Sequence, residues 1–327
     1  MTSNGQPTPA SMKQIDSAVL SRAQGCLLGQ LAGDALGSLV EFRNPENIRR
    51  QYPKGVRDLA DGGTWNTLAG QPTDDSEMAL ALARTLVRLR TYNSDEVRKS
   101  YVQWLESNPF DCGNTVRGGL RGQINPESQA NGALMRISPL GIFGVGYDLQ
   151  TLADWARPDA VLTHPHPVCI QANVLFTMAT AHAISTGIDA QALFREVEKW
   201  AEGINAEDVL LQVISGAATS PPSDYLHKQG WVLVALQNAL WQILHAPTLE
   251  EGIVDTVMRG GDTDTNAAIA GALLGAVHGR SAIPSRWVEK ILTCRPEAGQ
   301  KGVRRPRPTC YWPVDALELA EQLLHCR

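Results

Sequence analysis

Glycine or alanine recurs at every fourth position in two segments of this chain, and this spacing constrains the fold more than any other feature. The first series is Gly25, Gly29, Gly33 and Gly37. The second series is Ala267, Gly271, Gly275 and Gly279. Residues four apart share one helix face, and each interior glycine costs about 1 kcal/mol of helix stability relative to alanine. A close backbone approach would compensate this cost, so we expect two central helices in tight contact, with each other as candidate partners.

The periodicity of the whole chain predicts an all-α fold. Apolar residues recur at helical spacing and strand alternation is scarce, which indicates a single compact multi-helix domain. The expected helices cover residues 17–38, 75–91, 94–106, 166–186, 189–203, 230–246, 248–258, 264–280, 284–293 and 314–326. Ser94 is the expected N-cap of the third helix. Residues 43–72 and 107–131 are expected to be long loops, a type of segment that often carries function.

Composition limits the classes of partner and compartment. The net charge of −5 over 327 residues disfavours a nucleic-acid surface, and the arginines of GVRRPR (302–307) are expected in an exposed turn. The six cysteines form no CxxC pair, which opposes a zinc site and favours free thiols in a reducing compartment. Residues 1–16 resemble a flexible tail rather than a signal peptide, and the longest apolar run is too short to span a bilayer. We therefore expect a cytoplasmic protein without a membrane partner, whose single domain covers 17–327.

Two predicted helix starts are unusually rich in oxygen ligands. One carries Thr73, Asp74 and Asp75, and the other carries Asp262, Asp264 and Thr265. Each cluster alone is explained by helix capping, because carboxylates at a helix N-terminus are favourable. Together, two clusters of the same composition indicate the two halves of a dinuclear site for hard cations. Asp34, within the first glycine series, has two alternative interpretations. It is either an acid that supports this site or a hydrogen-bonded core residue.

Several motifs now point to one family. They are GCLLGQLAGDALGSLVEF, PTDDSEMALAL, GNTVRGGL, NGALMRISPLGI, LTHPHPVC, GGDTDTNAAIAGALLGAVHG and YWPVDALELAEQLL. Their order and content resemble the ADP-ribosylglycohydrolase family, including the dinitrogenase-reductase-activating and ADP-ribosylarginine hydrolases, from about residue 22 to 326. The resemblance implies an all-α fold with two Mg²⁺ or Mn²⁺ ions that cleaves the bond between ADP-ribose and an acceptor.

Carried over by position, the resemblance also implies roles for individual residues. The implied metal ligands are Thr73, Asp74, Asp75, Asp262, Asp264 and Thr265. Either Asp75 or Glu41 is the implied acid or base, although Glu41 alone would pass for an ordinary acid after a helix.

The resemblance places further residues near the substrate. The implied substrate-binding residues are Gly113, Asn114, Thr115, Asn131, Gly132, Ala133, His164 and Trp231. The turn at 131–133 would approach the diphosphate, while a plain tight turn is the alternative. Trp231 could contact the substrate or occupy a core position. Arg136 could contact a phosphate or form an internal ion pair. His166 is expected to cap the helix that follows it.

The expected function is metal-dependent removal of ADP-ribose from a mono-ADP-ribosylated protein, with arginine favoured as the acceptor. An additional role as an immunity protein against an ADP-ribosylating toxin is open, with that toxin as a possible partner. The alternatives are a pseudoenzyme that only binds ADP-ribose, a protein that occludes a toxin, a hydrolase of another ADP-ribosyl linkage, and a different two-metal hydrolase.

Overall fold

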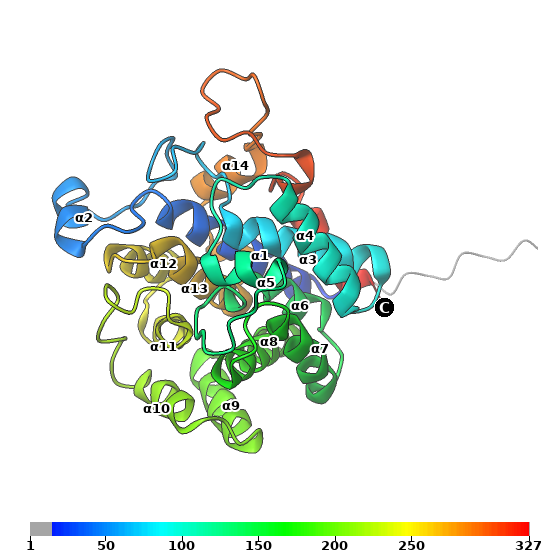
Figure 1. The fold of residues 1–327 in the computed structure, drawn as a ribbon. Coiled ribbons are helices and arrows are strands. Elements are labelled where there is room, and N and C mark those ends of the chain that lie inside the picture. Colours follow the sequence, from blue (N-terminus) through cyan, green and yellow to red (C-terminus); the bar gives the residue numbers. More distant parts are fainter. Residues whose placement is uncertain (1–14, 327) are drawn as a thin grey trace, which may run out of the picture.

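The computed structural model describes residues 15–326, and within them every regular element is a helix (Figure 1). The expected tail at 1–16 therefore lies outside the described residues, except for its last two positions. The α-helices are α1 (Ser17–Gly37), α2 (Pro45–Gln51), α3 (Asp74–Leu89), α4 (Ser94–Glu106), α5 (Asn114–Leu120), α6 (Ser138–Phe143), α7 (Leu149–Val161), α8 (Pro167–Thr186), α9 (Ala190–Gly203), α10 (Asp208–Gly216), α11 (Val232–His245), α12 (Leu249–Met258), α13 (Thr263–His278), α14 (Ser285–Thr293) and α15 (Ala316–His325). Short 3₁₀ turns occur at Leu134–Arg136, Arg280–Ala282 and Thr309–Tyr311. The prediction of an all-α domain is confirmed.

Helices α1 and α13 form the antiparallel pair that the two glycine series predict. A Cβ atom built on Gly25 would lie 2.5 Å from the carbonyl oxygen of Gly275, and Gly29 meets Gly271 still more closely. No side chain fits at such distances, so the two backbones touch directly. The end of the pair is fixed where the Thr263 hydroxyl donates to the carbonyl of Gly37 over 2.7 Å. This contact brings the C-terminus of α1 to the acidic start of α13.

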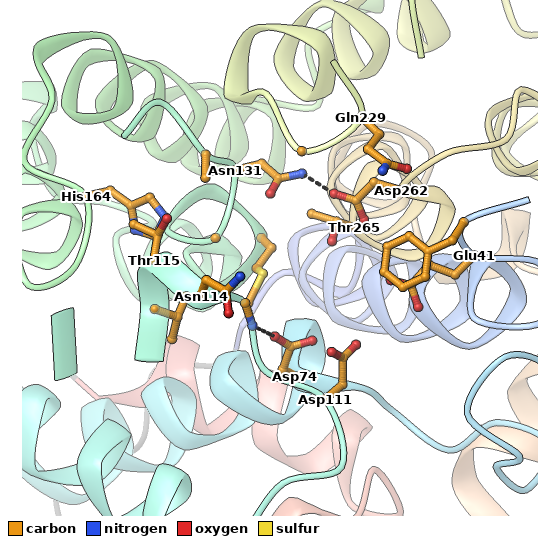
Figure 2. Close-up of a pocket in the computed structure, with 17 residues that line it drawn as sticks. Glu41, Asp74, Asp111, Asn114, Thr115, Asn131, His164, Gln229, Asp262 and Thr265 are labelled. Carbon is orange, nitrogen blue, oxygen red and sulfur yellow. Dashed lines mark hydrogen bonds between the residues drawn. The ribbon is translucent and has the colours of Figure 1, made fainter. Parts of the chain in front are cut away.

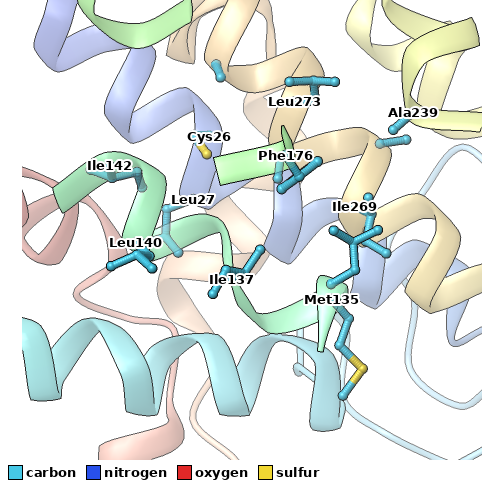
Figure 3. Packing of buried hydrophobic residues seen from close by; sticks show 14 of the residues in the cluster. Cys26, Leu27, Met135, Ile137, Leu140, Ile142, Phe176, Ala239, Ile269 and Leu273 are labelled. Carbon is cyan, nitrogen blue, oxygen red and sulfur yellow. The ribbon is translucent and has the colours of Figure 1, made fainter. Parts of the chain in front are cut away.

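The remaining helices enclose this pair. Helices α11, α12 and α8 pack against α13, and α8 and α6 contribute apolar side chains to the core that Figure 3 shows. Leu27, Phe176 and Leu273 are buried there, and they come from α1, α8 and α13. Helix α8 has the length and hydropathy of a membrane span, but 78% of its apolar window is buried within the protein. It therefore serves as a core helix of this fold.

Some sequence expectations about helix positions were wrong. The segments expected as long loops each contain a short helix, α2 within 43–72 and α5 within 107–131. Helices α6, α7 and α10 were not predicted at all. The N-cap of α4 is Asn93 rather than Ser94, because the Asn93 side chain accepts from the N–H of Glu96. Pro158 inside α7 and the two glycines in α5 weaken the helical signal of those segments.

The arginine-rich turn at 302–307 also differs from its prediction. Arg307 is buried, and its guanidinium donates to both carboxylate oxygens of Glu77 over 2.7 and 2.8 Å. Trp104 donates to the same carboxylate over 2.8 Å. Of the three arginines in the turn, the other two are exposed. The C-terminal segment is thus attached to α3, the helix whose first turn carries Asp74 and Asp75.

Candidate functional site

The first turn of α3 presents one set of acids. Thr73 is the N-cap residue, and both its N–H and its hydroxyl donate to the carboxylate of Asp34 over 2.9 to 3.1 Å. The N–H of Ser76 donates to Asp34 as well, over 3.1 Å. Asp34 therefore takes the place of the usual capping side chain for α3. Asp34 is thus a hydrogen-bonded core residue, and because its carboxylate also lies beside that of Asp75, it belongs to the acidic site as well.

The first turn of α13 presents the second set. Asp262 is the N-cap residue of α13, and its carboxylate accepts from the side-chain amide of Asn131 over 2.7 Å. Asp264 lies against Gly37 at the end of α1, where only a residue without a side chain leaves room for it. Thr265 follows and faces the cavity. The glycine interface thus determines how close this turn comes to α1 and α3.

The carboxylates of both helix starts meet in two groups. Asp34, Asp75 and Asp264 each offer an oxygen within 4.8 Å of the others, and Glu41, Asp262 and Asp264 do the same. Asp264 belongs to both groups. Within the described residues, Asp75 Oδ1 is buried and has no hydrogen-bond partner. Carboxylate oxygens arranged in this way suit hard divalent cations, and an unpartnered buried oxygen is the atom that such an ion would satisfy.

The cluster is electrostatically uncompensated. Burial, followed by the charge of Asp262, raises the pKa of Glu41 to about 8, although Trp65 donates to its carboxylate over 2.5 Å. Burial raises the pKa of Asp74 to about 6, against a hydrogen bond from the N–H of Gly113. Burial raises the pKa values of Asp75 and Asp264 well above the usual range too, with neighbouring carboxylates adding to the effect. Without added positive charge, the environment therefore shifts each of these groups toward its protonated form.

A cavity of about 340 Å³ opens beside the cluster (Figure 2). Its lining residues are Glu41, Phe42, Asp74, Asp111, Gly113, Asn114, Thr115, Val116, Ala130, Asn131, Gly132, Met135, His164, Gln229, Gly230, Asp262 and Thr265. Figure 2 shows acids on one side of this cavity, with His164 and Thr115 across from Glu41. This volume lies within the range of small-molecule sites.

Most of the predicted site residues come together at this cavity, but not all of them line it. Thr73, Asp75 and Asp264 lie behind the lining residues, in the carboxylate cluster itself. Ala133 is buried. Trp231 is half-buried beside the cavity, and its indole N–H donates to Gln129 over 2.8 Å. Its assignment as a substrate contact stays a prediction.

Two other sequence questions are resolved by contacts. Arg136 is fully buried in an ion pair with Asp159, with Nε 3.1 Å from Oδ1, so it has the internal role. His166 caps α8 as expected, because its Nδ1 accepts from the N–H of Val168 over 3.2 Å.

Sequence reasoning missed Asp111 as a residue of the cavity. Burial first, and then the charges of Asp74 and Glu41, raise its pKa to about 10. The available signal was its position two residues before the GNT motif. A single acid in a loop does not predict a site residue, however, because the sequence does not show where the loop lies in the fold. Phe42 was missed as well: it directly follows Glu41, has a positive φ of 63°, and remains 58% exposed at the rim.

An all-helical domain of this kind, with buried carboxylates beside a cavity, is the fold of one class of hydrolases. A family model described as ADP-ribosylglycohydrolase matches residues 16–324. The chain belongs to the ADP-ribosylglycohydrolase family.

Individual relatives agree with this assignment. The chain is 32% identical to the ADP-ribosyl-[dinitrogen reductase] glycohydrolase of Rhodospirillum rubrum, over 84% of this chain and 91% of that protein. It is 29% identical to the ADP-ribosylarginine hydrolase Tri1 of Pseudomonas putida (strain GB-1), over 83% and 74% of the two chains. A solved structure described as an ADP-ribosylglycohydrolase-related protein complex superposes with a TM-score of 0.77 at 26% identity, covering 94% of this chain and 99% of that one.

Proposed function

We propose that this protein hydrolyses the N-glycosidic bond between ADP-ribose and an arginine side chain of a modified protein, with two divalent cations, Mg²⁺ or Mn²⁺, as cofactors. The cofactor proposal rests on the two clusters of three carboxylates, which have Asp264 in common and lie beside a cavity of suitable size. The arginine acceptor is supported by the name of one relative, an ADP-ribosylarginine hydrolase. The name of another, an ADP-ribosyl-[dinitrogen reductase] glycohydrolase, supports a modified protein as the substrate.

The residues that would hold the cations extend the predicted set. Asp75, Asp262 and Asp264 are shared by both accounts, while the geometry adds Asp34. The carboxylate of Glu41 lies within 4.8 Å of those of Asp262 and Asp264, but its place at the cavity suits proton transfer instead. The carboxylate of Asp74 and the hydroxyls of Thr73 and Thr265 lie in the same two helix turns and complete the oxygen donors. When bound, the cations supply positive charge that polarises substrate oxygens.

The protein's own side chains divide the remaining work. Glu41 faces the cavity and Asp75 does not, so of the two candidates Glu41 is the acid or base and Asp75 is a ligand. The indole N–H of Trp65 orients the Glu41 carboxyl, and the amide of Asn131 orients Asp262. Glycoside cleavage needs a carboxyl that donates a proton to the leaving group or accepts one from water. Asp111 provides a second carboxyl at the same cavity.

The test is the release of free ADP-ribose from a protein carrying mono-ADP-ribosylarginine, measured with Mg²⁺, with Mn²⁺ and with EDTA. We expect release with either metal and none with EDTA. A serine-linked substrate run in parallel tests the acceptor. Binding of ADP-ribose without release from any linkage would instead identify a pseudoenzyme, and equal release with and without EDTA would overturn the cofactor proposal.

We propose the cytoplasm as the compartment, which is supported by the six cysteines, all of them free thiols. A role in immunity to an ADP-ribosylating toxin would use the same reaction. Protection of cells that express such a toxin by the wild-type protein, but not by Asp264→Ala, would support that role.

A further inference from the structure

The imidazole of His164 is held in an unusual way at the cavity. The side chain is buried, and its ring lines the cavity (Figure 2). Within the part of the chain that the structure describes, Nε2 has no hydrogen-bond partner. Nδ1, by contrast, lies 2.7 Å from the hydroxyl oxygen of Thr163. One ring nitrogen is therefore committed to the protein, and the other is left for a ligand.

A charged group behind Thr163 determines the direction of its hydrogen bond. The Arg136 guanidinium donates from Nη1 to the hydroxyl oxygen of Thr163 over 2.9 Å. The same guanidinium is fixed by Asp159, through Nε to Oδ1 over 3.1 Å and through Nη2 to the backbone carbonyl over 2.8 Å. Tyr101 donates to the other oxygen of Asp159 over 3.1 Å. Arginine can only donate, so the Thr163 oxygen must be the acceptor in this contact.

Among the residues that the structure describes, the hydrogen bonds of the Thr163 hydroxyl then leave its proton one acceptor, which is Nδ1 of His164. If Nδ1 carried a proton instead, the hydroxyl oxygen would accept twice and its own proton would be buried without a partner, which is costly. Nδ1 is thus an acceptor. In a neutral imidazole the hydrogen must then lie on Nε2, which becomes a donor.

Two further features keep this arrangement intact. Burial, and next the charge of Arg136, lower the pKa of His164 to about 3, so the ring stays neutral. The absence of a side chain at Gly132 leaves room for the ring, because a Cβ atom there would lie 3.0 Å from Cε1 and 3.2 Å from Nε2.

We propose that Arg136 and Thr163 are positioning residues that hold His164 as a neutral Nε2–H donor, aimed at an acceptor oxygen of the bound nucleotide sugar. The ligand class rests on the proposed function, whereas the tautomer does not. Arg136 contributes through Thr163 rather than through contact with the ligand, since its guanidinium is fully buried.

The direct test is the tautomer of His164, read from long-range ¹H–¹⁵N NMR correlations of the ring in the full-length protein. The wild-type ring should show a protonated Nε2 and an unprotonated Nδ1. Thr163→Val removes the hydroxyl at nearly constant shape, and it should mix the tautomers and weaken ADP-ribose binding by about tenfold in calorimetry. Thr163→Ser retains the hydroxyl and should restore both readouts.

A second pair of variants is independent of Thr163 and still decides the matter if Thr163→Val does not fold. His164→Gln places an amide near the position of Nε2, and His164→Asn places one near Nδ1. The Gln variant should retain the tighter ADP-ribose binding. A wild-type ring protonated on Nδ1, equal ADP-ribose affinity in Thr163→Val and Thr163→Ser, or tighter binding by the Asn variant would each overturn the proposal. Failure to hydrolyse ADP-ribosylarginine, with these readouts as expected, would overturn only the proposed function.

Discussion

Two regions of this molecule bury charged side chains, and they do so in opposite ways. In the first, each buried acid has an arginine: Glu77 pairs with Arg307, and Asp159 pairs with Arg136. In the second, the carboxylates of Asp74, Asp75, Asp262 and Asp264 have no basic partner among the ion pairs of residues 15–326. Burying charge is costly unless an opposite charge compensates it. The balanced pairs are therefore complete as part of the fold, while the unbalanced cluster requires positive charge from outside the chain.

The largest effect is expected from removing the acid of a buried ion pair, which leaves the arginine without its partner. Glu77→Ala leaves Arg307 buried without its partner, so the free energy of unfolding should fall by about 3–5 kcal/mol. Urea denaturation measures this change. Glu96→Ala is the matched control, because Glu96 pairs with Arg88 and Lys99 at the surface and its loss should have little effect. Similar losses for both variants would contradict the distinction.

The second prediction concerns the acid shared by both carboxylate groups. Asp264→Ala should lower ADP-ribose release by at least about a hundredfold, because it removes a ligand from both proposed cation positions. Unlike Glu77→Ala, it should leave the metal-free fold as stable as the wild type or more stable, since it relieves repulsion. Kinetics and thermal unfolding in EDTA check the two effects, with the exposed Asp154→Ala as control. Turnover near the wild-type value would exclude the assigned role.

The third prediction is a pH dependence of opposite sign with and without metal. The folded state raises the pKa of Asp74 to about 6 and that of Glu41 to about 8, above their unfolded values. The folded metal-free protein thus holds more protons, and these groups stabilise it fully below about pH 4 and lose that contribution as pH rises towards 8. Unfolding free energy in EDTA should fall by several kcal/mol across this window, because each unit of pKa shift corresponds to about 1.4 kcal/mol.

Saturating Mg²⁺ should reverse this trend, because the cations bind the deprotonated carboxylates of the folded state only. Thermal unfolding from pH 5 to 8, with Mg²⁺ and with EDTA, gives both curves. Asp74→Asn should flatten the EDTA curve in part. An increase in the stability of the wild-type protein with pH in EDTA, together with the same increase in Asp74→Asn, would contradict the absence of compensating charge in the cluster.

The smallest expected effect comes from a neutral neighbour of the cluster. Asn131→Ala removes the amide that donates to Asp262 over 2.7 Å, so the affinity for Mn²⁺ should fall by about tenfold. Calorimetric titration measures this affinity. Asn125→Ala, in an exposed part of the neighbouring loop, should leave it unchanged. An unchanged affinity in Asn131→Ala would mean that Asp262 needs no orienting group.

The parts of the site that the sequence predicts are those fixed by local rules. The four-residue glycine spacing predicts the close helix pair, and the acids at 74, 75, 262 and 264 follow from capping patterns at helix starts. Asp111 could not be placed in this way, because its proximity to Asp74 depends on how the loop before α5 folds back. The same holds for Arg307, whose partner Glu77 is 230 residues away in the chain. Long-range contacts of this kind leave no local periodicity.

The pairing of α1 with α13 has a consequence for synthesis on the ribosome. Thr263 and Gly37 meet across 226 positions of sequence. At about 5–20 residues per second, the glycine face of α1 waits roughly 10–45 s before its partner helix has been translated. The nascent chain can form local helices during that time, but it cannot bring Asp34 and Asp75 together with Asp264. Ribosome-bound chains that stop before residue 262 therefore lack half of the cluster, and cation binding would report that the start of α13 has been synthesised and has reached α1.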